Sequence, residues 1–150
     1  MTVTTDLFSL AMKFMGLKEV GGATHNPHVL AMLQLDSKWV ENDETPWCSA
    51  FVNYVCWLVS VKRSRSLAAR SWLLVGTSIP LSDAERGDIV VLKRGKEPQP
   101  GANVIKANGH VAFYAGQDDS TVQLLGGNQG NTVSIASYPK TSILSVRRLS

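Results

Sequence analysis

The sequence predicts a single α+β domain, with helices in the first part of the chain and an antiparallel sheet in the second. Apolar residues recur at helical spacing in several segments of residues 1–86. Residues 87–150 instead hold short β-branched segments separated by Gly, Asp, Asn or Pro. The 150 residues are 44% hydrophobic and 18% charged, which is typical of one globular domain. Helices followed by strands favour a sheet packed on a central helix.

The first two helices are predicted from apolar spacing and from capping residues. Residues 4–17 place apolar side chains on one helical face, and Gly16 closes the segment. Asn26 can cap a second short helix, in which Pro27 suits the first turn. The apolar residues of the two helices are Leu7, Leu10, Ala11, Phe14 and Met15, and then Val29, Leu30, Met32 and Leu33.

A third helix is predicted from Thr45 to about Ser60, with Thr45 as N-cap and Pro46 as its first residue. Cys48 then lies at the third helical position. The helix is apolar on nearly every side, which indicates a buried central element. A fourth helix is expected over residues 67–75, before Gly76.

Five strands are predicted after Gly87, each four to seven residues long. They are "DIVVLKR" (88–94), "HVAFYAG" (110–116), "TVQLLGG" (121–127), "TVSIAS" (132–137) and "ILSVRRL" (143–149). A long loop from Lys93 to Gly109 joins the first two of them. Loops of this length in a compact domain are usually functional or mobile.

Charge and hydropathy narrow the classes of partner. The net charge is +3, and the excess of basic residues lies at 62–66, 92–96 and 147–148. Such segments usually belong to a solvated face, but they would also favour anionic partners such as cell-wall polymer. No nucleic-acid-binding motif accompanies them, so no nucleic-acid partner is expected. The longest apolar stretch, 51–61, is too short to span a bilayer, so we expect no stable membrane insertion. Residues 1–14 lack the basic start of a secretory signal.

The two cysteines, Cys48 and Cys56, are predicted to lie on one helix. Their Cα atoms would then be about 12 Å apart, which is beyond the reach of a disulfide. Cys48 lies in the first turn, where free backbone N–H groups and the helix dipole stabilise an anion and lower a thiol pKa. An inert, buried cysteine is the alternative.

His110 and Asn128 are the candidate partners of Cys48. His110 begins a predicted strand directly after Gly109, where it can face a helix N-terminus across a cleft, although a structural histidine remains an alternative. Asn128 follows the next strand in "LLGGNQGN", so its amide can fix the imidazole tautomer, unless the segment is only a turn. Asp118 and Asp119 are alternative orienting groups, but "GQDDS" fits a hairpin tip better.

Two aromatic residues and two histidines complete the set of candidates. Trp47 and Tyr114 are near these elements and are candidate substrate contacts, with core packing as the alternative. His25 and His28 are three residues apart, but with Cys48 they match no metal-binding framework. We expect no metal and no cofactor.

The cysteine, the histidine and the polar residue, in this chain order, resemble the papain-like peptidoglycan hydrolases of the CHAP and NlpC type. The resemblance rests on "DETPWCSAFVNYV", "GDIVVLKRG", "GHVAFYAG" and "LLGGNQGN" and covers most of residues 43–150. It is strongest to single-domain, phage-associated members. It implies a papain-like α+β fold, in which N-terminal helices and a central nucleophile-bearing helix pack on a C-terminal antiparallel sheet of about five strands.

The resemblance also implies an activity and its residues. It implies a monomeric amidase or endopeptidase that cuts the peptide part of peptidoglycan and lyses bacteria, with Cys48 as nucleophile, His110 as base and Asn128 as orienting residue. Many CHAP members carry a glutamate two positions before that asparagine, where this chain has Gly126. We therefore expect a three-residue site.

The expected setting is a phage endolysin, made in the host cytoplasm without a signal peptide and acting on the cell wall after release by another factor. The alternatives are an antibacterial amidase effector, a catalytically silent wall-binding module, and a cysteine protease that acts on proteins.

Overall fold

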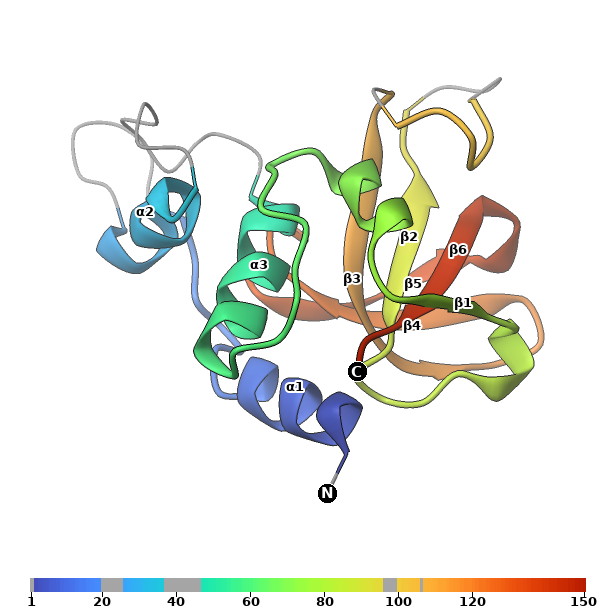
Figure 1. Ribbon diagram of the computed structural model, residues 1–150, viewed down its shortest axis with the longest axis horizontal. Coiled ribbons are helices and arrows are strands. Elements are labelled where there is room, and N and C mark those ends of the chain that lie inside the picture. The colour runs from blue at the N-terminus through green and yellow to red at the C-terminus, as the bar shows by residue number, and fades with distance from the viewer. Residues whose placement is uncertain (1, 20–25, 37–46, 96–99, 106) are drawn as a thin grey trace.

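The computed structural model describes residues 2–19, 26–36, 47–95, 100–105 and 107–150 of the chain. Figure 1 shows α1, α2 and α3 on one side and the sheet on the other, with α3 between α2 and the strands. The α+β class predicted from the sequence is confirmed. No helix within these residues is long and apolar enough to cross a bilayer.

The described helices follow the predicted order. They are α1 (Val3–Met12), α2 (Pro27–Gln34) and α3 (Cys48–Leu58), with short 3₁₀ helices at Ala69–Leu74, Leu81–Asp83 and Lys140–Ser142. Asn26 caps α2, because its side chain accepts hydrogen bonds from the backbone N–H groups of His28 and Val29.

Two helix predictions need correction. Helix α3 begins at Cys48, with Trp47 in the N-cap position, so Cys48 is the first helical residue and not the third. Thr45 and Pro46 lie outside the described residues. The segment predicted as a fourth α-helix forms the 3₁₀ helix Ala69–Leu74, which ends before Gly76 at a φ of 73°.

The sheet has six antiparallel strands in the described part of the chain, in the order β1-β6-β2-β3-β4-β5. They are β1 (Thr77–Ile79), β2 (Ile89–Lys93), β3 (Gly109–Gln117), β4 (Thr121–Gly126), β5 (Ser134–Pro139) and β6 (Ile143–Arg148). All five predicted strands are present. The additional one, β1, is a three-residue edge strand that pairs with β6.

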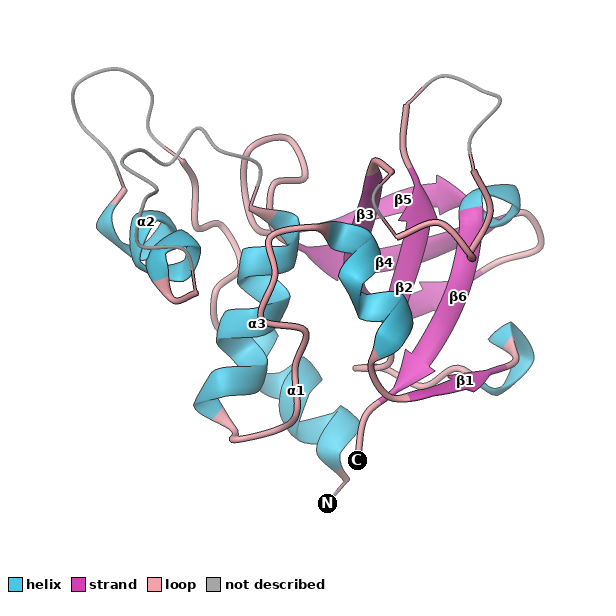
Figure 2. Cartoon of the chain, turned by 45° about the horizontal axis from the view of Figure 1, so that its top comes forward, coloured by secondary structure: helices cyan, strands magenta, loops and turns pink. Residues whose placement is uncertain are grey.

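Strand residues alternate between two apolar clusters. Val111 and Phe113 of β3 pack toward α3, and Phe51 of α3 meets Phe113 with ring centroids 6.2 Å apart. Ala112 and Tyr114 point to the opposite face, into a second cluster. Residues from both edge strands, β1 and β5, border this second cluster, which agrees with the curved sheet in Figure 2.

Candidate active site

Cys48 is held at the start of α3, against the start of β3. It is 4% exposed, and the Val111 backbone N–H donates a hydrogen bond to its sulfur. Burial raises the pKa of the Cys48 thiol, while this hydrogen bond, the charge of Arg94 and the N–H groups of the first helical turn act in the opposite direction. The resting group is therefore a thiol, surrounded by groups that stabilise a thiolate.

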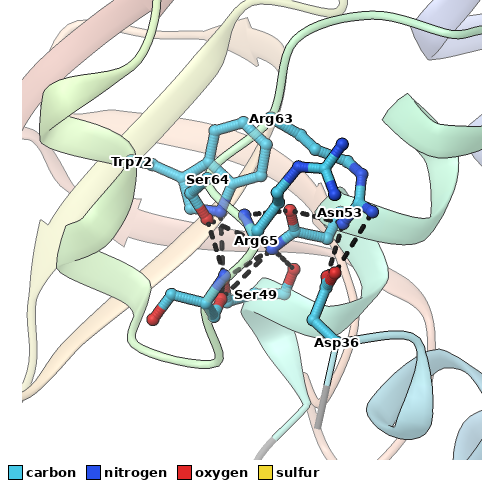
Figure 3. A network of polar contacts seen from close by, with 8 residues as sticks. Asp36, Ser49, Asn53, Arg63, Ser64, Arg65 and Trp72 are labelled. Carbon is cyan, nitrogen blue, oxygen red and sulfur yellow. Dashed lines mark hydrogen bonds and ion pairs between the residues drawn. The ribbon is translucent and has the colours of Figure 1, made fainter.

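The first turn of α3 is fixed by a buried polar network around Ser49 (Figure 3). Ser49 Oγ donates to the Ser66 carbonyl over 2.6 Å and accepts from Trp72 Nε1 over 3.0 Å. Asn53, one turn later, donates to the Ser49 carbonyl and to the Ser66 carbonyl. Ser49 follows Cys48 directly, so these bonds set the position of the thiol.

The same network extends to the neighbouring segments. Asn53 Oδ1 accepts from the backbone N–H of Arg65 at 2.9 Å and from the Arg63 guanidinium at 3.4 Å. Arg63 also forms an ion pair with Asp36, just after α2. The amide of Asn53 thus joins α3 to residues 63–66, and the ion pair joins that segment to α2 (Figure 3).

His110 is the second residue of β3 and is 5% exposed. Burial lowers the pKa of His110 to about 4. The hydrogen bond that His110 donates to Gln129 opposes this change, and the charge of Arg94 adds to it. The imidazole is therefore neutral at pH 7, in the form that can accept a proton.

Gln129 fixes the tautomer of that imidazole. His110 Nε2 lies 2.9 Å from Gln129 Oε1. Gln129 Nε2 donates to the carbonyls of Leu124 and Ser134, which assigns the oxygen of the amide to the histidine side. An amide oxygen only accepts, so His110 Nε2 carries the hydrogen. Nδ1 is left as the basic nitrogen.

Tyr138 of β5 completes the group around the imidazole. Its hydroxyl donates to Gln129 Oε1 over 3.0 Å and lies 3.3 Å from His110 Nε2. Its ring also stacks on His110, with centroids 5.3 Å apart and planes tilted by 34°. Burial raises the pKa of Tyr138 to about 12, so the hydroxyl remains a donor at neutral pH.

Gly126 and Gly127 allow the end of β4 to approach these groups. A Cβ at Gly126 would lie 2.7 Å from Ala112 Cβ and 2.9 Å from Gln129 Oε1. A Cβ at Gly127 would lie 2.8 Å from Trp47 and from Phe51. The first glycine makes room for the Gln129 side chain, and the second allows β4 to pack against the start of α3.

The structure places Gln129, the neighbour of Asn128, in the position beside His110 that was expected for Asn128. Gln129, and not Asn128, contacts His110, and the Asn128 side chain has no hydrogen bond to any described residue. Asn128 has a φ of 58°, a left-handed conformation that asparagine tolerates better than most residues. The turn conformation therefore accounts for an asparagine at position 128. The sequence signal for Gln129 was present in the same segment, since Gly126 leaves space beside the strand.

The other candidates lie away from the site. Trp47 is fully buried in the core, and Tyr114 is buried in the second cluster, where its hydroxyl accepts from Gln117 Nε2. Both side chains therefore pack in the core, the alternative stated above, and neither lines the two pockets beside Cys48 and His110. Asp118 caps the β3–β4 hairpin through the Ser120 and Thr121 backbone N–H groups, as expected for a hairpin tip.

Two pockets open beside the candidate residues. One, of about 230 Å³, is lined by His110, Gln129 and Tyr138, and the other, of about 490 Å³, by Cys48. Arg94, which directly follows β2, lines both. The thiol and the imidazole are therefore approached from adjoining depressions with a cation at their junction. Neither Arg94 nor Tyr138 was singled out from the sequence.

A buried arginine holds one wall of the Cys48 pocket. Arg70 is fully buried, and its guanidinium donates to the carbonyls of Pro100, Gly101, Val104 and Asn108 over 2.8–3.1 Å. Asn108 lines the pocket. The described part of the long loop predicted between β2 and β3 is thus tied to the protein at several points.

No group of three or more His, Cys, Asp or Glu residues that could hold a metal ion occurs among the residues the structure describes. His28 is exposed at the start of α2, and His25 lies outside the described residues. Both cysteines are free: Cys56 is buried two turns into α3, and burial raises its pKa to about 12.

No protein-family model and no curated protein matches the chain. Several solved structures do match it in fold. The P60 domain of the antigen MAP1204 from Mycobacterium avium subspecies paratuberculosis superposes with a TM-score of 0.57 at 20% identity, over 97% of this chain and 93% of that one. The peptidoglycan hydrolase RipB from Mycobacterium tuberculosis gives 0.57 at 21% identity, over 97% and 63%. RipD from Mycobacterium tuberculosis, a non-catalytic NlpC/p60 domain protein adapted to peptidoglycan binding, gives 0.56 at 14% identity, over 99% and 98%.

These comparisons establish the fold. The chain has the papain-like α+β fold of NlpC/P60 proteins, as the resemblance in the sequence predicted. It spans 63% of the length of RipB and 43% of the length of NlpC1 from Trichomonas vaginalis.

Proposed function

We propose that this chain, with its NlpC-type papain-like fold, is a cysteine hydrolase that cuts an amide bond in the peptide part of bacterial peptidoglycan. In this proposal Cys48 is the nucleophile, His110 is the base and Gln129 orients the base. RipB, of the same fold, is a peptidoglycan hydrolase, which supports the choice of substrate.

The observation that carries the proposal is the tautomer of His110. Gln129 occupies Nε2 and leaves Nδ1 basic, while the thiol of Cys48 is bonded to the adjacent residue of the same strand, Val111. Here Nδ1 has no hydrogen-bond partner among the described residues, which supports a role in proton transfer.

The proposed reaction follows from these positions. His110 Nδ1 takes the thiol proton as the sulfur of Cys48 attacks the amide carbonyl carbon. The carbon–nitrogen bond then breaks, and the imidazolium returns the proton to the leaving amine. Water, activated by the same nitrogen, hydrolyses the thioester and regenerates the thiol.

Backbone groups at the start of α3 are suited to hold the oxyanion. The first backbone N–H groups of a helix have no intrahelical partner, and here they belong to Cys48, Ser49 and Ala50. Phe51 N–H makes the first intrahelical bond, to the Trp47 carbonyl over 3.0 Å. The Ser49 network keeps this turn in place, so its donors are preorganised for a developing negative charge.

The decisive experiment is digestion of purified peptidoglycan, with mass spectrometry of the released fragments. We expect the wild-type protein and Cys56→Ala to release the same fragments, and Cys48→Ala and His110→Ala to release none while remaining folded. The new termini identify the bond as an amidase or an endopeptidase product. EDTA should leave the rate unchanged, whereas an alkylating agent should abolish it. Full activity of Cys48→Ala would overturn the assignment.

A wall-binding module is the second candidate, because RipD combines this fold with peptidoglycan binding and no catalysis. Burial also keeps both Cys48 and His110 in their neutral forms. This candidate predicts that the wild-type protein sediments with insoluble peptidoglycan, releases no fragments, and binds equally well as Cys48→Ala.

The biological setting is also part of the proposal. An endolysin-like protein, released to the wall by another factor, would lyse bacteria whose outer membrane has been permeabilised. An antibacterial effector would act on the same bond. Expression in the bacterial cytoplasm with and without a co-expressed holin distinguishes an endolysin, which should lyse the cells only when the holin is present.

A further inference from the structure

Arg94 is a cation of the candidate active site that has no hydrogen-bond or ion-pair partner among the described residues. It is exposed, directly follows β2, and lines both the Cys48 pocket and the His110 pocket. Lys93 also lines the second pocket. Neither pocket is lined by an aspartate or a glutamate within the part of the chain that the structure describes. The junction of the two pockets is therefore positively charged.

Other arginines of the protein are already engaged. Arg63 is paired with Asp36, and Arg148 with Asp88. Arg70 donates to backbone carbonyls. Arg94, in contrast, forms no hydrogen bond or ion pair with any residue in the described ranges. Its planar fork of N–H donors, which matches a carboxylate, is thus available to a ligand.

The charge of Arg94 also affects the pKa of the side chains proposed to react. It lowers the pKa of Cys48, of His110 and of Tyr138, although burial is the larger influence on each. A group bound to this guanidinium would therefore lie close to the amide that Cys48 attacks. Because Lys93 and Arg94 line the pockets and no carboxylate of the described residues does, an anionic substrate group is favoured there over a cationic one.

We propose that Arg94 binds a carboxylate of the substrate, so that the enzyme prefers stem peptides with a free carboxylate beside the cleaved amide to the same peptides in amidated form. This inference rests on the proposed function and adds the substrate class. Amidation replaces a charged carboxylate by a neutral carboxamide of similar shape. The site would distinguish these two forms of the peptide.

The experiment compares two synthetic peptidoglycan stem peptides that differ only at the glutamate, which carries either a free α-carboxylate or the matching carboxamide. For the wild-type protein we expect kcat/KM to be about tenfold higher for the acid. In Arg94→Gln this ratio should fall to about one, because activity on the acid falls by about tenfold more than activity on the amide. Any effect of the lost charge on the Cys48 thiolate slows both substrates equally and does not change the ratio. Arg94→Lys should keep part of the preference, because it retains the charge but not the fork.

Lys62→Gln is the matched control. Lys62 is exposed and lines a different pocket, near Trp57. Its removal lowers the net charge by the same amount as Arg94→Gln, so an unchanged acid-to-amide ratio in Lys62→Gln excludes a general charge effect. The preference of the wild-type protein should also weaken as salt is raised.

Binding provides a readout that does not depend on turnover. Calorimetry with Cys48→Ala should show tighter binding of the acid than of the amide, and the difference should vanish in Cys48→Ala with Arg94→Gln. Equal treatment of both peptides by the wild-type protein, or an equal loss on both in Arg94→Gln, would overturn the proposal while leaving the hydrolase intact. Discrimination in binding without any cleavage would uphold Arg94 and instead refute the hydrolase.

Discussion

Gln129 occupies the space that a side chain at Gly126 would need, since a Cβ at position 126 would lie 2.9 Å from Gln129 Oε1. The two positions cannot both carry a side chain toward the imidazole. The orienting amide thus comes from the turn after β4 and not from the strand itself. Where many CHAP members carry a glutamate, this chain has Gly126, and the Gln129 amide lies in the space beside it.

Gly126→Ala should disturb the orienting amide. The added methyl group meets Ala112 Cβ at 2.7 Å as well as Gln129, so the amide must move away from His110. We expect peptidoglycan hydrolysis to slow by about tenfold or more and the free energy of unfolding to fall by about 1–3 kcal/mol. Gly116→Ala is the control, because its Cβ would meet only the end of Gln123, at 3.4 Å. Equal rates in the two variants would contradict the steric argument.

Gln129→Ala should slow hydrolysis by about 100-fold or more, because the imidazole loses the acceptor that fixes its tautomer. Asn128→Gly should remain near wild type, since glycine readily adopts the φ of 58° at this position. Initial rates on peptidoglycan, with circular dichroism to verify folding, separate the two. The opposite ranking would return the orienting role to Asn128.

Tyr138→Phe should reduce the rate by several-fold and keep the fold. The ring still stacks on His110, but the hydroxyl no longer donates to Gln129 Oε1. The loss of one hydrogen bond costs about 1 kcal/mol of stability. Tyr114→Phe removes a hydroxyl of the same kind, bonded to Gln117 in the other cluster, and should lose similar stability without a change in rate.

The low pKa of His110 predicts a loss of stability in acid. The folded-state value of about 4 lies below the ordinary 6.5, so the unfolded chain binds a proton first as the pH falls. The contribution is fully present above pH 6.5 and is lost as the pH falls toward 4, with a size on the order of 3 kcal/mol. Urea unfolding at pH 7 and pH 4 should show a smaller change for His110→Gln than for the wild type. An NMR titration of His110 with a midpoint near 6.5 would be incompatible with this account.

Asn53→Ala should destabilise the protein by about 2–4 kcal/mol, because it leaves the backbone N–H of Arg65 and the buried Ser49 network without their partner. The start of α3 should loosen as well, so activity should be lost at a lower temperature. Asn103→Ala, on the exposed surface, is the control and should change stability by less than about 0.5 kcal/mol. Thermal and urea unfolding measure both.

The order of the elements was predictable because it depends on local spacing, whereas the boundaries near the site were not. Apolar periodicity located α1, α2, α3 and five strands, and Asn26 caps α2 as predicted. The start of α3 was placed before Cys48 from capping residues, but the helix begins at Cys48 itself. Strand β1 was not predicted, because three residues are too few to show an alternating apolar pattern. It forms by pairing with β6, which is distant in the sequence.

The ends of elements also explain which site residues were predictable. Cys48 and His110 lie in the first residues of a helix and of a strand, and the sequence locates these elements even where their exact boundaries differ. Gln129 lies in a turn where Asn128 and Asn131 both adopt positive φ, and that conformation decides which amide points inward. Tyr138, on β5, contacts His110, on β3, across the curved sheet. Trp47 is buried and packs closely against Gly127. Such contacts are set by tertiary packing.

The antiparallel run β3-β4-β5 has a consequence for how the chain acquires activity as it folds. The base, its orienting amide and the tyrosine all belong to residues 109–139, which form consecutive hairpins with short loop closures. The nucleophile is about 60 residues earlier in the chain and meets them only through the long-range docking of α3 on β3. In the proposed mechanism, the base and its orienting amide are brought together by contacts close in sequence, whereas the site is complete only after α3 has docked on β3. A chain that lacks this long-range contact should therefore be inactive.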